Sequence, residues 1–144
     1  PNDPVTANYQ PPGYPPDVTT DEIKRIITKE CGPRNIVPAI AIKIYESEGL
    51  TDYQSRVITE SGTREQSYGP YQLYRGGGLG NEYERLTGRD LRTDNTKVGI
   101  TKQIQFALDR AVILGWEPWY GRRVVGVGVR DGIPSNAKVE NNWK

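Results

Sequence analysis

The sequence predicts a mostly helical α+β domain with one small β-hairpin. Two observations indicate this class. Apolar residues recur at helical spacing in segments 19–31 and 94–114. A turn-rich centre at 60–64 is flanked by β-branched and aromatic residues, which is typical of a short hairpin. With 144 residues, the chain is long enough for one domain that buries about two-thirds of its unfolded surface.

The N-terminal segment differs from the rest in composition. Residues 1–16 contain six of the 11 prolines. We therefore expect residues 1–18 to form a Pro-rich extended arm or linker and residues 19–144 to form the folded domain. Because the chain begins at Pro1, we expect it to be a processed or excised piece, so a targeting segment or flanking domain can be missing from this sequence.

The first predicted helix follows Thr19. Thr19 and Glu22 have the spacing of a capping box, and Gly32-Pro33 is a stop signal. The apolar face of this helix comprises Ile23, Ile26 and Ile27.

The second predicted helix is apolar almost all round over residues 36–45, so we expect it to be buried. Asn35 can cap its start, and Pro38 falls in the first turn, where proline is tolerated. We expect the helix to end near Glu48, with Gly49 as the residue after its C-terminus.

A hairpin and a glycine-rich stretch follow. Segments 54–59 and 65–73 are the predicted strands around the turn at 60–64. Glycines dominate residues 75–80, which allows the backbone to approach a ligand or a neighbouring helix closely. No Gly-Lys-Ser/Thr pattern follows, so this stretch does not predict a phosphate loop.

Two further helices complete the pattern. A short one over residues 81–86 ends at Gly88. The longest begins at Asp94 or Asn95 and ends at Gly115.

An aromatic cluster occupies residues 116–121. Trp116 and Trp119 flank a helix end, so we expect both in the core rather than on a ligand. The tail from Arg122 alternates valines with glycines and predicts a strand or an irregular wrap.

Composition excludes several classes of function. The chain has 19 basic and 18 acidic residues without a basic run, so no nucleic-acid partner is expected. It has no His and only Cys31, which excludes Ser-His and Cys-His catalysis and a thiolate metal cage. No apolar stretch approaches the roughly 20 residues that span a bilayer. We expect no metal and no cofactor, and acid–base chemistry must come from carboxylates, Tyr or Lys.

Glu46 is the first candidate for that chemistry. It ends the apolar helix, where desolvation would raise its pKa above the free value of about 4.3. A carboxylic acid that holds its proton near neutral pH can break a glycosidic bond. The alternative is that Glu46 has no functional role and simply lies at a helix C-terminus, where a negative charge is unfavourable.

The segment Ile36–Gly49, with Glu46 followed by Ser47, resembles the catalytic helix of lytic transglycosylases of the soluble, goose-lysozyme-like superfamily. The sequence from Gly69 to Gln72 is similar to the Gly-x-x-Gln motif of that family, and Ser67 precedes it as a Ser often does there. The resemblance covers roughly residues 21–121. It is strongest to phage-borne members that open the bacterial wall during genome entry.

Two departures from the family pattern are visible. The spacing between Glu46 and Gln72 is longer than in bacterial members, and the extra length falls in the predicted hairpin. The downstream Tyr-containing motif is matched only loosely, by residues 119–121.

The resemblance implies a lysozyme-like fold with the hairpin beside the active-site helix, and cleavage of the MurNAc–GlcNAc bond of peptidoglycan. The implied partner is the peptidoglycan glycan strand, with no nucleic acid and no membrane insertion by this segment. Other virion proteins or flanking domains would accompany the chain. It would be virion-associated or delivered to the periplasm and cell wall.

The mechanism has two forms. In a transglycosylase, Glu46 is the acid and then the base, and the C6 hydroxyl of the substrate attacks to give a 1,6-anhydro sugar. An inverting hydrolase needs a second carboxylate about 6.5–9.5 Å away. Asp52, Glu60 and Glu65 are candidates, and Glu60 is the preferred one. From another class, a wall-binding or structural virion module without turnover is the alternative.

The remaining candidates would bind sugar. Ser47 would hold Glu46 or contact a sugar, with helix capping as the alternative. Gln72 offers a donor and an acceptor to an N-acetyl or hydroxyl group, with a plain hairpin residue as the alternative. Gly69 would let the chain turn so that Gln72 faces the cleft. Ser67 from the motif, and the rings of Tyr68, Tyr71 and Tyr120, complete the set, each ring being an equal candidate for the core.

Overall fold

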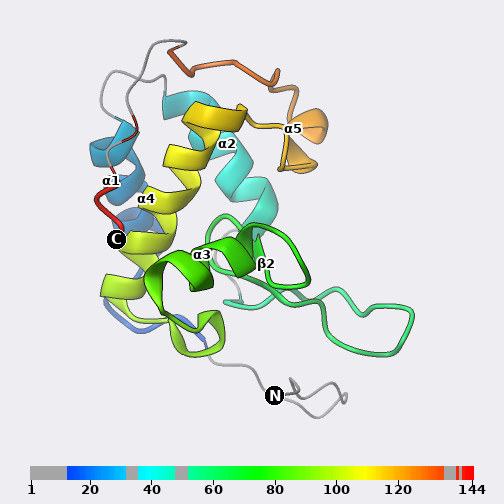
Figure 1. The fold of residues 1–144 in the computed structure, drawn as a ribbon. Helices are drawn as coiled ribbons and strands as arrows, with labels where there is room; N and C mark the ends of the chain where they lie inside the picture. The colour runs from blue at the N-terminus through cyan, green and yellow to red at the C-terminus, as the bar shows by residue number, and fades with distance from the viewer. Residues whose placement is uncertain (1–12, 32–35, 48–51, 135–138, 140) are drawn as a thin grey trace.

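A computed structural model describes residues 13–31, 36–47, 52–134, 139 and 141–144. The architecture is α+β and mostly helical, with a two-stranded antiparallel sheet. Figure 1 shows helices gathered on one side and an extended hairpin that projects from them. This confirms the predicted class of fold.

The long helix α4 (Lys97–Leu114) forms the centre of the core. Ile100, Ile104, Phe106 and Ala107 are all fully buried on it. Helix α1 (Thr20–Cys31) packs against α4 and presents the three predicted isoleucines to the core. The Glu22 N–H donates to Thr19 Oγ1 at 3.1 Å, so the predicted start of α1 is confirmed. The predicted stop at Gly32-Pro33 lies outside the described residues.

Helix α2 (Ile36–Ser47) packs against α1 and against a short helix, α5 (Gly121–Val124). It is not buried all round as predicted, because Val37, Ile44 and Tyr45 are exposed. Helix α2 has more apolar side chains than the core covers, so one side of this helix faces a cleft. The predicted cap Asn35 and the predicted end at Glu48-Gly49 lie outside the described residues.

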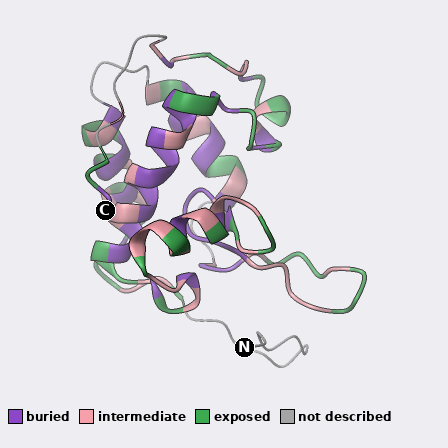
Figure 2. Ribbon diagram, viewed as in Figure 1, coloured by how far each residue is buried: buried purple, intermediate pink, exposed green. Residues whose placement is uncertain are grey.

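The predicted hairpin forms around residues 60–64. Its arms pair through antiparallel bridges between Gln54 and Tyr68 and between Ile58 and Arg64. The prediction of one strand over 65–73 is wrong, because the chain turns over residues 69–72. This turn joins strand β1 (Ser67–Tyr68) to strand β2 (Leu73–Tyr74), with Ser67 opposite Tyr74. Figure 2 shows exposed and intermediate residues along most of the projecting hairpin.

Helix α3 (Leu79–Thr87) follows the glycine-rich stretch and packs against β2. Its predicted end is confirmed, since Gly88 has φ +73° and its N–H donates to Glu84 O at 2.9 Å. It begins earlier than predicted. The Asn81 side chain accepts hydrogen bonds from the Gly77 and Gly78 N–H groups, at 2.6 and 3.2 Å, and so caps the helix from within.

The start of α4 also differs from the prediction. Its N-cap is Thr96, whose hydroxyl accepts from the Gly99 N–H at 3.0 Å. A short 3-10 helix, η1 (Leu91–Thr93), precedes it. Asp94 is buried, where it accepts hydrogen bonds from Tyr83 at 2.5 Å and Gln103 at 3.1 Å and pairs with Arg89. Its carboxylate therefore joins α3 to α4 instead of capping α4.

Both ends of the described chain lie against the core. Tyr14 packs edge-on against Tyr53, with ring centroids 5.6 Å apart, and Val18 is buried. At the other end, Trp143 is fully buried and its indole N–H donates to Asp109 Oδ2 at 2.6 Å. The tail from Arg122 completes α5 and then follows turns, so of the two predicted forms the strand is absent from its described residues and the irregular path is present. Val125 N–H and Val127 N–H bond back to residues 121 and 122.

Within the described residues, no helix is both long enough and apolar enough to cross a bilayer.

Candidate functional site

A cleft of about 1000 Å³ lies between α2, the hairpin, β2 and the start of α3. Its carboxylates are Glu46, Glu65 and Glu82, and no Lys or Arg is among the described residues that line it. Glu82 pairs with Arg110 at 2.9 Å, so its charge is compensated. The cleft is of the size expected for a ligand site, and it is acidic at Glu46 and Glu65.

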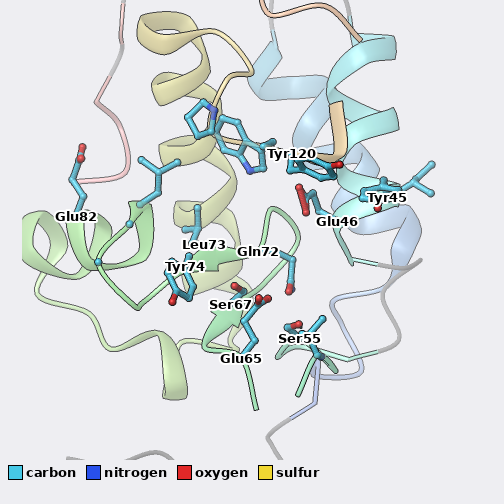
Figure 3. Close-up of a pocket in the computed structure, with 17 residues that line it drawn as sticks. Tyr45, Glu46, Ser55, Glu65, Ser67, Gln72, Leu73, Tyr74, Glu82 and Tyr120 are labelled. Carbon is cyan, nitrogen blue, oxygen red and sulfur yellow. The ribbon is translucent and has the colours of Figure 1, made fainter. Parts of the chain in front are cut away.

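Glu46 projects into this cleft from the last turn of α2 (Figure 3). The pKa of Glu46 is raised to about 7, and burial is the largest cause. A hydrogen bond from the Gly121 backbone lowers this pKa, and the charge of Glu65 contributes to raising it. The proton of Glu46 is therefore held to a higher pH than that of a solvated carboxylic acid. The expectation of a desolvated carboxylic acid at the end of an apolar helix is met.

The approach of α5 to α2 controls this environment. A Cβ on Gly121 would lie 2.8 Å from Tyr45 Cε1 and 3.2 Å from Glu46 Oε1. Only glycine leaves room for both side chains there. The backbone N–H of Gly121 thereby reaches the Glu46 carboxylate.

One face of the hairpin forms the opposite wall. Ser55 N–H donates to Ser67 O at 2.9 Å, and Glu65 N–H donates to Val57 O at 2.8 Å, so these residues pair across the hairpin. All four line the cleft, as does Tyr74, which is opposite Ser67. Residues two apart in a strand share a face, and this register places Glu65 and Ser67 together toward Glu46, as Figure 3 shows.

Glu65, rather than Glu60, is the second carboxylate of the cleft. Glu60 is exposed in the turn of the hairpin and does not line the cleft, so its preferred place among the candidates is wrong. Asp52 pairs with Arg56 and lines a small hollow next to Glu46 instead. The alternation of residues along the strand, which places 65 and 67 on one face, is a sequence signal that could have identified Glu65.

Gln72 lines the cleft with a left-handed backbone, φ 49°. Its Nε2 donates to Gly69 O at 2.9 Å, which fixes the side chain beside the turn. Gly69 has φ +81°, and a Cβ there would collide with the Gln103 side chain. Gly69 is therefore a turn residue that positions Gln72, as expected, and does not itself line the cleft.

Two predicted ligand contacts lie elsewhere. Tyr68 is 1% exposed and packs on Tyr53, with ring centroids 5.7 Å apart, so it belongs to the core. Ser47 is buried, and its hydroxyl donates to Lys43 O at 2.8 Å in its own helix. Ser47 lines the small hollow beside Glu46 but not the main cleft.

Aromatic rings surround the rest of the cleft. Tyr120 lines it, as predicted, and is 68% exposed, with the Arg123 guanidinium 5.5 Å from its ring centroid. Trp119 is buried, as is Trp116, which confirms both as core residues, although Trp119 also reaches the cleft wall. Tyr45 and Tyr74 line the cleft but were not predicted from the sequence.

Tyr71 is the remaining ring of the motif. It is buried, donates its hydroxyl to Ala39 O at 3.0 Å and accepts the Trp119 indole N–H on its backbone O at 2.9 Å. It thereby joins α2, the 69–72 turn and the aromatic cluster, and holds Glu46 and Gln72 on one framework.

No protein-family model, curated protein or solved structure matches this chain. In the described ranges no group of three or more Cys, Asp or Glu side chains could hold a metal ion.

Proposed function

We propose that this chain cleaves the β-1,4 bond between MurNAc and GlcNAc in peptidoglycan, as a lytic transglycosylase with a lysozyme-like fold. The observation that supports it best is Glu46, a carboxylic acid with a pKa of about 7 that opens onto a cleft lined by polar side chains and aromatic rings. Such a group donates a proton to a glycosidic oxygen at neutral pH.

The reaction needs one acid–base residue. Glu46 donates its proton to the bridging oxygen, the bond from C1 to that oxygen breaks, and the electron pair leaves with the GlcNAc O4. The C6 hydroxyl oxygen of the MurNAc then bonds to its own C1, and its proton passes to the Glu46 carboxylate. The product is a 1,6-anhydro sugar, Glu46 is again protonated, and no cofactor takes part.

The other side chains have supporting roles. Gln72, held by its bond to Gly69 O, keeps one amide hydrogen and its carbonyl oxygen for an N-acetyl or hydroxyl group. Ser67 adds a hydroxyl on the facing wall. The charge of Glu65 favours the oxocarbenium-like transition state.

A second candidate is an inverting hydrolase, and the position of Glu65 in the cleft favours it over a hydrolase that uses Glu60. Here Glu65 would take a proton from water as the water attacks C1. In either form the substrate is the glycan strand, and the protein acts at the cell wall, as a part of a virion or delivered to the periplasm.

Mass spectrometry of the digestion products of purified wall separates the two reactions. Anhydro-muropeptides are the result expected here. Muropeptides with a reducing-end MurNAc that takes up ¹⁸O from labelled water would establish the hydrolase. No products from the intact chain, together with retention on the wall, would make it a binding module.

A further inference from the structure

Tyr74 is a large ring that the fold leaves 47% exposed inside the cleft. It lies on β2, where its neighbour Leu73 is buried in the core. Its cross-strand partner is Ser67, so the ring and the Ser67 hydroxyl share the face that lines the cleft (Figure 3).

The glycines of residues 76–78 keep the backbone close to this ring. A Cβ on Gly76 would overlap the hydroxyl end of Tyr74 and lie 2.9 Å from its Cε1. A Cβ on Gly78 would lie 3.3 Å from Tyr74 Cδ2. Gly77 and Gly78 also line the cleft. One side of the ring therefore rests on glycine backbone, which fixes its orientation, while the rest is open to a ligand.

A second glycine contact fixes the strand that carries the ring. A Cβ on Gly80, in the first turn of α3, would lie 2.6 Å from the backbone carbonyl of Tyr74. The helix can approach β2 this closely only with glycine there. The glycine-rich stretch is thus shaped around Tyr74.

We propose that Tyr74 is a stacking platform for a neutral hexosamine ring, with Gly76 and Gly78 as the residues that hold it in position. A pyranose presents an apolar C–H face to an aromatic ring, and the phenol hydroxyl serves its polar edge. This assignment rests on the proposed function and adds to it the residue that binds the sugar. Tyr74 is a binding residue, and Gly76 and Gly78 act through it.

The test is a double-variant cycle of Tyr74→Ala and Gly76→Ala. Gly76 has no left-handed φ, so alanine strains no backbone there, and the colliding atoms are the movable end of the Tyr74 side chain. Binding of an uncharged GlcNAc hexamer is measured in the Glu46→Gln background, and cleavage of wall is measured with Glu46 present. Gly13→Ala is the matched control, because its Cβ would meet nothing within 4 Å.

Each single variant should weaken hexamer binding roughly fivefold to tenfold and raise KM more than it lowers kcat. Gly76→Ala should have no further effect once Tyr74 is alanine, and Tyr74→Trp should restore binding. Melting temperatures should stay within a few degrees of the parent.

Three results would overturn the assignment. If Tyr74→Ala binds the hexamer as the parent does and the parent cleaves wall, Tyr74 is not a sugar-binding residue, and the proposed function is unaffected. Additive losses in the double variant would show that Gly76 does not act through the ring. If the parent neither binds the hexamer nor cleaves wall, the proposed function fails and the platform with it. If Tyr74→Ala does not fold, hexamer binding by Tyr74→Trp and Gly76→Ala tests the assignment: binding should be kept in Tyr74→Trp and weakened in Gly76→Ala.

Discussion

The backbone N–H of Gly121 hydrogen-bonds to the carboxylate of Glu46, and a Cβ at position 121 would come within 3.2 Å of that carboxylate. The C-terminal third of the chain therefore contacts the acid directly, at a residue that has no side chain.

Gly121→Ala should lower cleavage strongly while the rest of the core stays folded. The new methyl group would overlap Tyr45 and crowd Glu46, which moves the acid away from its position relative to the bond. Misplacement on the scale of 1 Å can cost about 100-fold in rate. Specific activity and melting temperature are measured together. Activity within twofold of the parent would show that α5 does not position Glu46.

Glu46→Gln should abolish cleavage, because it removes the proton donor of the cleft. General acid–base catalysis contributes about 10²–10⁴-fold. Turbidity loss of purified wall is the measurement, and Glu60→Gln is the matched control, since Glu60 is exposed outside the cleft and should leave activity unchanged. A variant at position 46 that keeps a tenth of the activity would exclude this residue as the acid.

The pH profile should fall on its alkaline side near pH 7, where Glu46 loses its proton. Glu65→Gln removes the neighbouring charge that raises the pKa of Glu46, so this limb should move to lower pH. The shift should be a modest one, since burial is the larger cause. An alkaline limb that stays in place in Glu65→Gln would mean that the two carboxylates do not interact.

Stability should respond to pH through the same residue. Its folded pKa is raised from 4.5 to about 7, so the protonated form is favoured on folding. That contribution is complete below about pH 4.5 and is lost as pH rises through 7. Melting temperatures of the parent and Glu46→Gln should therefore diverge between about pH 4.5 and pH 7, with the parent losing stability relative to the variant as pH rises. Parallel curves would contradict the raised pKa.

Gln72 allows strain and binding to be separated. Its left-handed φ of 49° costs about 1–3 kcal/mol in a residue other than glycine. Gln72→Ala keeps the strain and loses the bond to Gly69 O, whereas Gln72→Gly removes both. Gln72→Gly should therefore be more stable than Gln72→Ala by about 1 kcal/mol. Chemical denaturation measures this difference.

Both variants at position 72 should lose activity by roughly a few-fold to tenfold, the worth of one neutral hydrogen bond. Full activity in the glycine variant would make Gln72 a turn residue only, and the resemblance of the 69–72 motif would lose its functional meaning.

Local signals predicted the helices well. The Thr19 cap and the glycines at 88 and 115 act within a few residues, so their physics is readable in sequence. Asp94 was misread for the opposite reason. Its side chain bonds to Tyr83 and Gln103, partners that only the packing of α3 on α4 brings near.

The site was predictable where one element determines it. Glu46 follows from the apolar helix alone. Tyr68 and Tyr120 have the same chemistry in the sequence, yet tertiary contacts bury the first and expose the second. Glu60 and Glu65 are both carboxylates of the predicted hairpin, and only the strand alternation seen in the structure decides that Glu65 faces the cleft.

The hairpin wall has a consequence for how this cleft can change. Residues 65 and 67 face Glu46 because the pairing of Ser55 with Ser67 places them on one face of the arm, while Tyr68 on the other face is buried in the core. A one-residue slip of this register would expose Tyr68 and bury the cleft face, so the core opposes it. The turn at 60–64 can therefore change in length or sequence without exchanging the residues that face Glu46.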